Sequence, residues 1–96
     1  MEPANSDIIV SDVVVSRAGR DQGEWFYVID ADDTCLLLVN GKDRPLDKPK
    51  RKKRKHAQKV LRSETRVAAK LRSGDKVLNG ELRRDLAFLA REFASE

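Results

Sequence analysis

The chain is organised around residues 13–29, which read VVVSRAGRDQGEWFYVI. Its first five residues predict a strand, because β-branched side chains suit a pleated, half-buried surface. Residues 18–23 are the expected turn, in which Gly19 and Gly23 permit a positive φ or the close approach of another backbone. Residues 24–30 resume as a second strand. The stretch therefore predicts a strand-turn-strand unit.

The second of these strands carries three consecutive aromatic residues. Neighbouring side chains in a strand point to opposite faces, so Trp25 and Tyr27 share one face while Phe26 and Val28 share the other. We expect Phe26 and Val28 to lie in the core. Trp25 and Tyr27 are then expected to lie partly across the outer surface.

Three further segments predict short strands. Residues 8–10 are apolar and suit an edge piece or the lead-in to the first strand. Residues 34–39 are apolar on both faces, which favours a central strand, and residues 56–61 supply a last strand. Four or five short strands separated by glycine-bearing turns predict a small closed β-barrel.

The connection after residue 39 has two distinct signals. Asn40-Gly41 favours a type I′ hairpin turn, which needs a positive φ at both central residues. Pro45 and Pro49 then favour an extended loop, because each proline excludes the residue before it from the helical region.

The pattern changes to helical after residue 62. Ser63 is placed to cap a first helix that ends at Gly74, and Asn79 is placed to cap a second. The apolar residues of the first helix are Val67, Ala68 and Leu71. Those of the second fall at helical spacing, at Leu82, Leu86, Leu89 and Phe93.

At 96 residues the chain is expected to form one domain with a modest core. We divide it into a flexible tail (1–7), a barrel (8–62) that includes a basic loop (44–56), and a two-helix C-terminal extension (63–96). The predicted fold class is mainly β.

The positive charge is concentrated in one part of the chain. Residues 1–43 hold three Lys or Arg and nine Asp or Glu, a balance of −6, whereas residues 44–62 hold ten and one, a balance of +9. Residues 63–96 hold seven and six, so the whole chain carries +4. A local excess of this kind is typical of a surface that binds a polyanion.

Composition argues against several other classes of protein. Cys35 is the only cysteine and His56 the only histidine, so we expect no disulfide, no metal site, no cofactor and no catalysis. A thiol in an apolar strand stays protonated. No run of residues approaches the length of a membrane span, and the acidic start lacks the features of a signal peptide, which favours a cytoplasmic protein.

The basic run at residues 48–55 points to nucleic acid. Seven of its eight residues are Lys or Arg, and charges packed this densely repel one another unless a polyanion neutralises them. Phosphate neutralisation releases counterions, so binding should depend steeply on salt. A solvated charged loop or a localisation signal are the alternatives. The candidate phosphate contacts are Arg17, Arg20, Lys42, Arg44, Lys48, Lys50, Arg51, Lys52, Lys53, Arg54, Lys55, His56, Lys59 and Arg62.

Two weaker features accompany the basic run. Trp25 and Tyr27, where exposed, are candidates for stacking on unpaired RNA bases, although a run of aromatics is more often core. The arginines of the second helix, Arg83, Arg84 and Arg91, either extend the basic surface or form an ordinary solvated helix face.

The sequence resembles the KOW motif of ribosomal proteins and NusG-type transcription factors. The first part of the resemblance is S-x-A-G-R-D-x-G at residues 16–23, and the second is R-P-L-D-K-P-K-x-K-x-x-K-H at residues 44–56. Together they resemble small bacterial KOW-domain RNA-binding proteins related to KOW-bearing large-subunit ribosomal proteins. The resemblance covers roughly residues 10–62. Asn40 stands where we expect an acidic residue, and it suits a turn equally well.

The resemblance implies an SH3-like β-barrel that binds RNA. We therefore expect a non-enzymatic RNA-binding module associated with the ribosome or translation, whose likeliest partner is ribosomal or another structured RNA. The alternatives are a module that binds a transcription or translation factor, and non-specific binding of nucleic acid including DNA.

Overall fold

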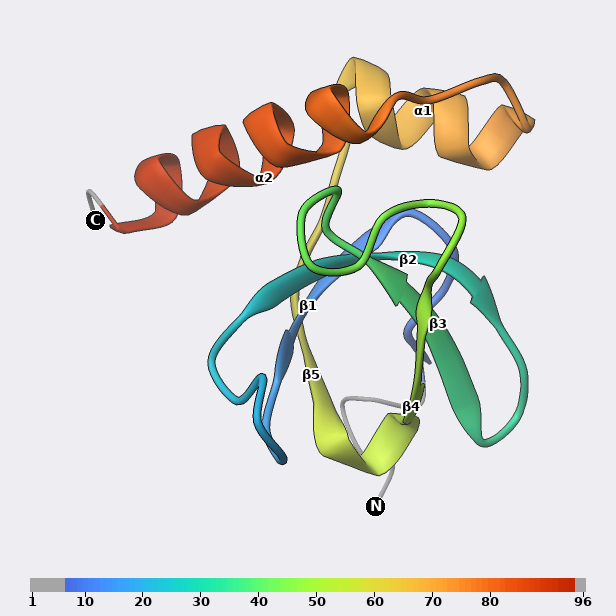
Figure 1. Cartoon of the computed structure of the whole chain (residues 1–96), viewed down its shortest axis with the longest axis vertical. Coiled ribbons are helices and arrows are strands. Elements are labelled where there is room, and N and C mark those ends of the chain that lie inside the picture. Colours follow the sequence, from blue (N-terminus) through green and yellow to red (C-terminus); the bar gives the residue numbers. More distant parts are fainter. Residues whose placement is uncertain (1–6, 95–96) are drawn as a thin grey trace.

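The computed structural model describes residues 7–94, which form one five-stranded antiparallel sheet followed by two helices (Figure 1). The strands are β1 (Asp12–Ser16), β2 (Trp25–Ala31), β3 (Cys35–Val39), β4 (Lys50–Lys53) and β5 (Ala57–Arg62). The helices are α1 (Arg66–Ser73) and α2 (Asn79–Ala94). The mainly β prediction with two C-terminal helices is confirmed. The predicted tail lies almost wholly outside the described residues, and its last residue, Asp7, is exposed.

The strand order is β4-β3-β2-β1-β5, and every described pair of neighbours is antiparallel. The two edge strands are linked by a single 3₁₀ turn, η2 (Arg54–His56). Within residues 7–94 these edge strands share no ladder, so the curled sheet is open along one seam. The predicted closure of the barrel by strand pairing is therefore not seen.

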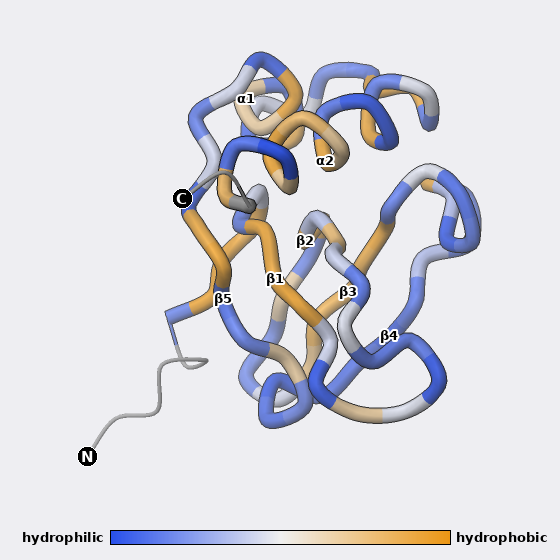
Figure 2. Tube along the Cα trace, turned by 90° about the vertical axis from the view of Figure 1, so that its left-hand side faces the viewer, coloured by the Kyte–Doolittle hydropathy of each residue, from blue (hydrophilic) through white to orange (hydrophobic). Residues whose placement is uncertain are grey.

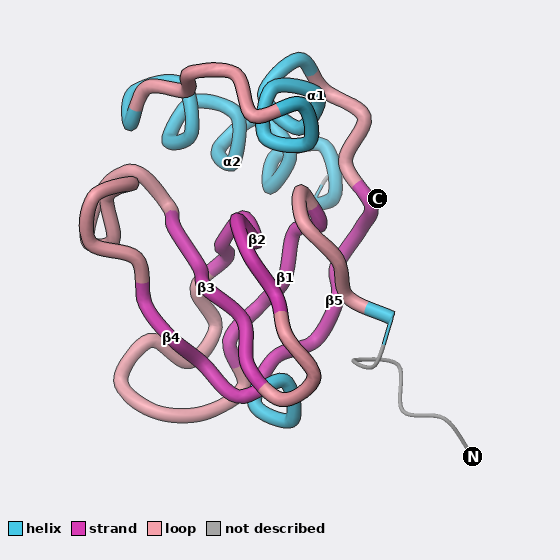
Figure 3. The backbone as a smooth tube through the Cα atoms, turned by 90° about the vertical axis from the view of Figure 1, so that its right-hand side faces the viewer, coloured by secondary structure: helices cyan, strands magenta, loops and turns pink. Residues whose placement is uncertain are grey.

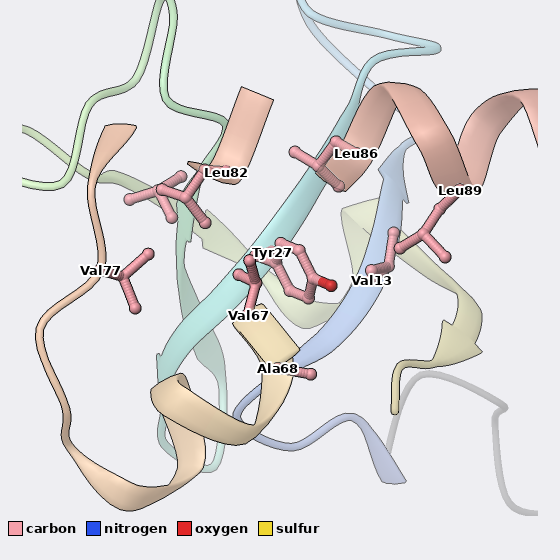
Figure 4. Packing of buried hydrophobic residues seen from close by; sticks show 9 residues of the cluster. Val13, Tyr27, Val67, Ala68, Val77, Leu82, Leu86 and Leu89 are labelled. Carbon is pink, nitrogen blue, oxygen red and sulfur yellow. The ribbon is translucent and has the colours of Figure 1, made fainter. Parts of the chain in front are cut away.

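The two faces of the sheet bury two separate apolar clusters. Phe26 and Val28 lie inside the curl with residues of β1 and β3, as predicted. On the opposite face, Tyr27 packs with Val13 under the two helices (Figure 4). Strands β1 and β3 are accordingly apolar along most of their length, whereas β4 is hydrophilic (Figure 2). A central strand covered on both faces needs apolar residues at successive positions.

The prediction that Tyr27 lies on an outer surface is wrong, because α1 and α2 cover that face and Tyr27 is fully buried. Trp25, near the edge of the covered face, is half-buried. Its ring meets that of Phe93 edge to face at a centroid distance of 6.0 Å.

The helix boundaries differ slightly from those predicted. Thr65 caps α1, since its Oγ1 accepts the main-chain N–H of Ala68 at 3.3 Å, whereas the Ser63 hydroxyl pairs with the Tyr27 hydroxyl at 2.8 Å. Gly74 ends α1 with φ +79° as predicted, and α2 begins at Asn79. None of the helices in the described part of the chain is long and apolar enough to cross a membrane.

The connection between β3 and β4 is a ten-residue loop (40–49), and the predicted type I′ turn is wrong. Gly41 has φ +77°, but Asn40 does not share a positive φ. The Asn40 Oδ1 instead accepts the main-chain N–H groups of Lys42 and Arg44, both at 2.9 Å. A side-chain oxygen that binds nearby N–H groups offers the backbone an alternative to a tight turn.

The predicted basic loop (44–56) is also wrong as a single loop. Lys50–Lys53 pair with β3 as an edge strand, and the next three residues form η2. Pairing fixes which way each basic side chain points, and this decides their roles.

Candidate nucleic-acid interface

Strand β4 divides its four basic residues between two faces. Lys50 and Lys52 pair with Leu38 and Leu36, whose side chains are buried inside the curl. The alternate residues Arg51 and Lys53 point to the outer face and are exposed. The period of two along a strand therefore splits the basic run into an inner and an outer set.

The inner set is bound to Asp21 in the turn between β1 and β2. The Nζ of Lys52 lies 3.0 Å from Asp21 Oδ1, 2.9 Å from Ser16 Oγ and 2.9 Å from the carbonyl oxygen of Ala18. The Nζ of Lys50 lies 2.9 Å from Asp21 Oδ2. Lys52 is 7% exposed, so its predicted role as a phosphate contact is wrong.

Asp21 holds this cluster as an ionised carboxylate. Burial alone would raise its pKa, but the hydrogen bond from Ser16 and those from Lys50 and Lys52 outweigh burial. Together they hold the pKa of Asp21 well below its ordinary value. The cluster joins the turn between β1 and β2 to the edge strand β4, two segments that no strand pairing links, and it fixes the glycine turn against β4.

Three other predicted contacts are occupied within the fold. Arg54 donates to the carbonyl oxygens of Asp32 and Ile8, at 2.7 and 3.0 Å. On β5, Lys59 Nζ lies 3.4 Å from the fully buried Asp12, and Arg62 Nε donates to the same carboxylate at 3.1 Å. A buried carboxylate needs such partners to remain charged. The main role of these three side chains is therefore to stabilise the fold, and any phosphate binding comes second.

The outer cations gather at the end of the sheet away from the helices. The main-chain N–H of Arg17 donates to the carbonyl oxygen of His56 at 2.8 Å, so the glycine turn and η2 lie side by side. Both segments lie at the end opposite α1 and α2 (Figure 3). We call the exposed residues Arg17, Arg20, Lys53 and Lys55 the basic pole.

The basic pole has no internal charge partner. Within residues 7–94, none of its four side chains forms an ion pair or a side-chain hydrogen bond. Arg51, on the outer face nearby, lies 4.0 Å from the exposed Asp32. Exposed pairs at that distance contribute little, so Arg51 remains available to a ligand.

The loop between β3 and β4 adds Lys42, Arg44 and Lys48, of which Lys42 and Lys48 are exposed. A hollow of about 250 Å³ lies between this loop and the glycine turn. Arg20 lines it from the turn and Arg44 from the loop. The hollow connects the basic pole to the loop cations, although Glu24 and Asp43 also line it.

Tyr27 is not available for base stacking. Its hydroxyl donates to the carboxylate of Asp85 and pairs with Ser63, while Thr65 donates to the same carboxylate at 2.8 Å. Burial, and then the hydrogen bond to Asp85, raise the pKa of Tyr27 to about 12. The partners lie 36 to 58 residues away in the sequence, so no local pattern predicts this network.

The turn glycines behave as predicted, with φ +83° at Gly19 and +91° at Gly23. Cys35 and His56 are both half-buried, on β3 and η2. Across residues 7–94 no three His, Cys, Asp or Glu residues are grouped so that they could hold a metal ion. Ser16 and Asp21 are the residues whose role sequence reasoning missed, since they entered only as part of a motif.

No protein-family model matches the chain, and no curated protein matches it.

Proposed function

We propose that the chain is a cytoplasmic, non-enzymatic RNA-binding module that acts at the ribosome or in translation. In this proposal the curled sheet is an SH3-like barrel of the KOW type, with its glycine turn held against β4 by Asp21, Lys50 and Lys52. The basic pole and Arg51 bind phosphates, and the loop cations extend this surface.

One observation carries the proposal. The two motif segments, residues 16–23 and 44–56, lie side by side in the fold, joined by Asp21 to Lys52 at 3.0 Å and by Arg17 to His56 at 2.8 Å. Their inner residues Asp21, Lys50 and Lys52 pair with one another, and among the described residues the four residues of the basic pole remain as unpaired cations. Cations held on a rigid frame lose less conformational entropy when a ligand binds, so binding costs less free energy.

The charge of these cations suits phosphate better than an acidic protein surface. Each phosphate that a cation neutralises releases condensed counterions, which gives affinity without sequence preference. The glycine turn, held by Asp21, would let the backbone approach the RNA closely.

The test compares two double variants of equal charge. Lys53→Gln with Lys55→Gln removes two cations from the basic pole, and Arg66→Gln with Lys76→Gln removes two exposed cations from the helical end. RNA affinity is measured at several salt concentrations. We expect the first pair to weaken binding and to reduce the salt slope by about 1.4 to 1.8, since each phosphate contact adds about 0.7 to 0.9.

The control pair should change neither quantity appreciably. Equal effects of the two pairs would show that only net charge matters, and the basic pole would be abandoned as the site. Titrations with ribosomal RNA fragments, duplex DNA and single-stranded DNA separate an RNA-binding module from a general nucleic-acid binder.

A protein partner is the second candidate, and one observation favours it. An open apolar hollow of about 640 Å³ is lined by Ile9, Val10, Ile29 and Leu71 at the end of α1. Ile9 is 48% exposed there. Under this alternative, Ile9→Ser would abolish capture of a translation factor while RNA affinity stayed unchanged.

A further inference from the structure

Helix α2 presents two opposite faces. Leu82, Leu86 and Leu89 are buried against the sheet and α1. At 3.6 residues per turn, Arg84 and Arg91 lie about 180° to 200° around the helix from Leu82, and Phe88 lies about 240° around it. All three are exposed, and Phe88 is 45% exposed. We call Arg84, Phe88 and Arg91 the arginine face.

The arginine face has little acid to neutralise it. Glu81, one turn before Arg84, is occupied by Lys70 Nζ at 2.8 Å and by the main-chain N–H of Leu78 at 2.9 Å. Asp85 is turned inward to Tyr27. Glu81 and Glu92 both lie at the border of the face, about 260° and 280° around the helix from Leu82, and the charge of Arg84 also acts on Glu81.

Two guanidinium groups also gather at the start of the helix. A β carbon on Gly80 would lie 3.3 Å from Arg84 Nη1 and 3.8 Å from Arg83 Nη2. Both arginine side chains therefore lie near Gly80. The start of α2 therefore adds to the positive potential of the arginine face.

The start of α2 is bonded to the loop between β3 and β4. Arg83 Nη1 donates to the carbonyl oxygen of Gly41 at 2.9 Å, and Asn79 Oδ1 accepts the main-chain N–H of Leu46 at 2.8 Å. These bonds fasten the loop that carries Lys42 and Lys48 to α2. The start of α2 therefore lies against the loop that carries two exposed cations.

We propose that the arginine face is a second contact for RNA, at which an unpaired base stacks on Phe88 while Arg84 and Arg91 bind the flanking phosphates. This proposal rests on the proposed function. An aromatic ring between basic residues is the arrangement by which proteins grip single strands, because every base offers a π face. It gives the two-helix extension a role in binding RNA.

The first experiment tests stacking through an uncharged change. Phe88→Leu keeps an apolar side chain but removes the aromatic ring, and Phe88→Tyr keeps the ring. Binding is measured with a fluorescent single-stranded RNA and with a fully paired RNA duplex. Because Phe88 is exposed, neither change should alter the thermal unfolding of the protein.

We expect Phe88→Leu to weaken single-strand binding about fivefold to a hundredfold, the range that loss of one base stack produces. Phe88→Tyr should bind within about twofold of the unchanged protein. The salt slope should stay the same, because no charge is lost. Duplex binding should not change, since paired bases cannot stack on a protein ring.

The second experiment changes charge. Arg84→Gln with Arg91→Gln should lower both the affinity and the salt slope, whereas the matched pair Arg66→Gln with Lys76→Gln should not. If the basic-pole variants weaken RNA binding and the α2 variants do not, the proposed RNA contact at the arginine face is refuted. The proposed function is then still supported.

If the α2 variants alone weaken binding, the basic pole is not an RNA contact, whereas the arginine face is one. If neither set weakens RNA binding, both proposals fail. If the α2 variants abolish capture of an acidic protein and leave RNA binding intact, the arginine face is a protein site and the inference is wrong.

Discussion

Lys52 on the edge strand β4 places its ammonium 3.0 Å from Asp21 in the turn between β1 and β2, two segments that no strand pairing joins. Both residues are buried, with Lys52 7% and Asp21 9% exposed. A buried lysine is costly without a carboxylate, so the pair holds the turn and β4 in one arrangement.

Asp21→Asn should destabilise the protein, because it leaves Lys52 as a buried charge without its counter-ion. We expect a loss of about 3 kcal/mol in the free energy of unfolding, as for other broken buried pairs. Urea unfolding measures it. Asp43→Asn, at an exposed site, should cost less than about 0.5 kcal/mol. Equal costs for the two variants would contradict the buried pair.

Low pH should also destabilise the protein, through protonation of Asp21. Its pKa is lowered in the folded state, so the unfolded chain binds the proton more readily, and stability falls as the pH drops below the ordinary Asp value of about 3.9. Above that pH the contribution is fully present. Unfolding free energies of the protein and of Asp21→Asn, measured between pH 6 and 2, should converge as the pH falls. Parallel curves would argue against this linkage.

The Tyr27 hydroxyl should lose its proton only at high pH, because burial and the hydrogen bond to Asp85 raise its pKa to about 12. The raised value favours the folded state below pH 10, and this contribution is lost as the pH rises from about 10 to 12. As the only tyrosine, it can be followed by phenolate absorbance without overlap from another residue. Ionisation with a midpoint near 10 in the folded protein would show that the network is absent.

Removing the Tyr27 hydroxyl should loosen the helices from the sheet. Tyr27→Phe leaves Asp85 without its buried donor, and we expect a cost of about 1 to 3 kcal/mol. Hydrogen exchange should show faster exchange in α1 and α2 than in β3. Uniform acceleration in all three elements would indicate global destabilisation instead.

Two glycines with a positive φ should respond differently to alanine. At Gly41 a β carbon would lie 2.2 Å from the carbonyl oxygen of Asn79, whereas at Gly23 nothing lies within 4 Å. Gly23→Ala should therefore cost only the backbone strain, about 1 to 2 kcal/mol. Gly41→Ala should cost clearly more, because α2 must shift, and thermal unfolding compares them. Similar melting temperatures would place α2 farther from the loop than described.

Much of the architecture could be predicted from local patterns. The β-branched and apolar runs gave β1, β2 and β3 within one residue, and Gly74 and Asn79 marked a helix end and a helix start. The type I′ turn failed because the Asn40 side chain bonds to the loop backbone instead. Ser63 does not cap the helix, because its hydroxyl is hydrogen-bonded to the hydroxyl of Tyr27, which is far away in the sequence.

Local patterns were enough to predict β1, β2, β3, β5 and the two helices, and the concentration of positive charge in residues 44–62, because propensity and charge are local properties. Which of those charges are free depends on how the strands pair in three dimensions. Strand pairing turns Lys50 and Lys52 inward to Asp21 and leaves Lys53 outward, and the helices bury Tyr27. Those outcomes depend on contacts between residues distant in the chain, which no local pattern encodes.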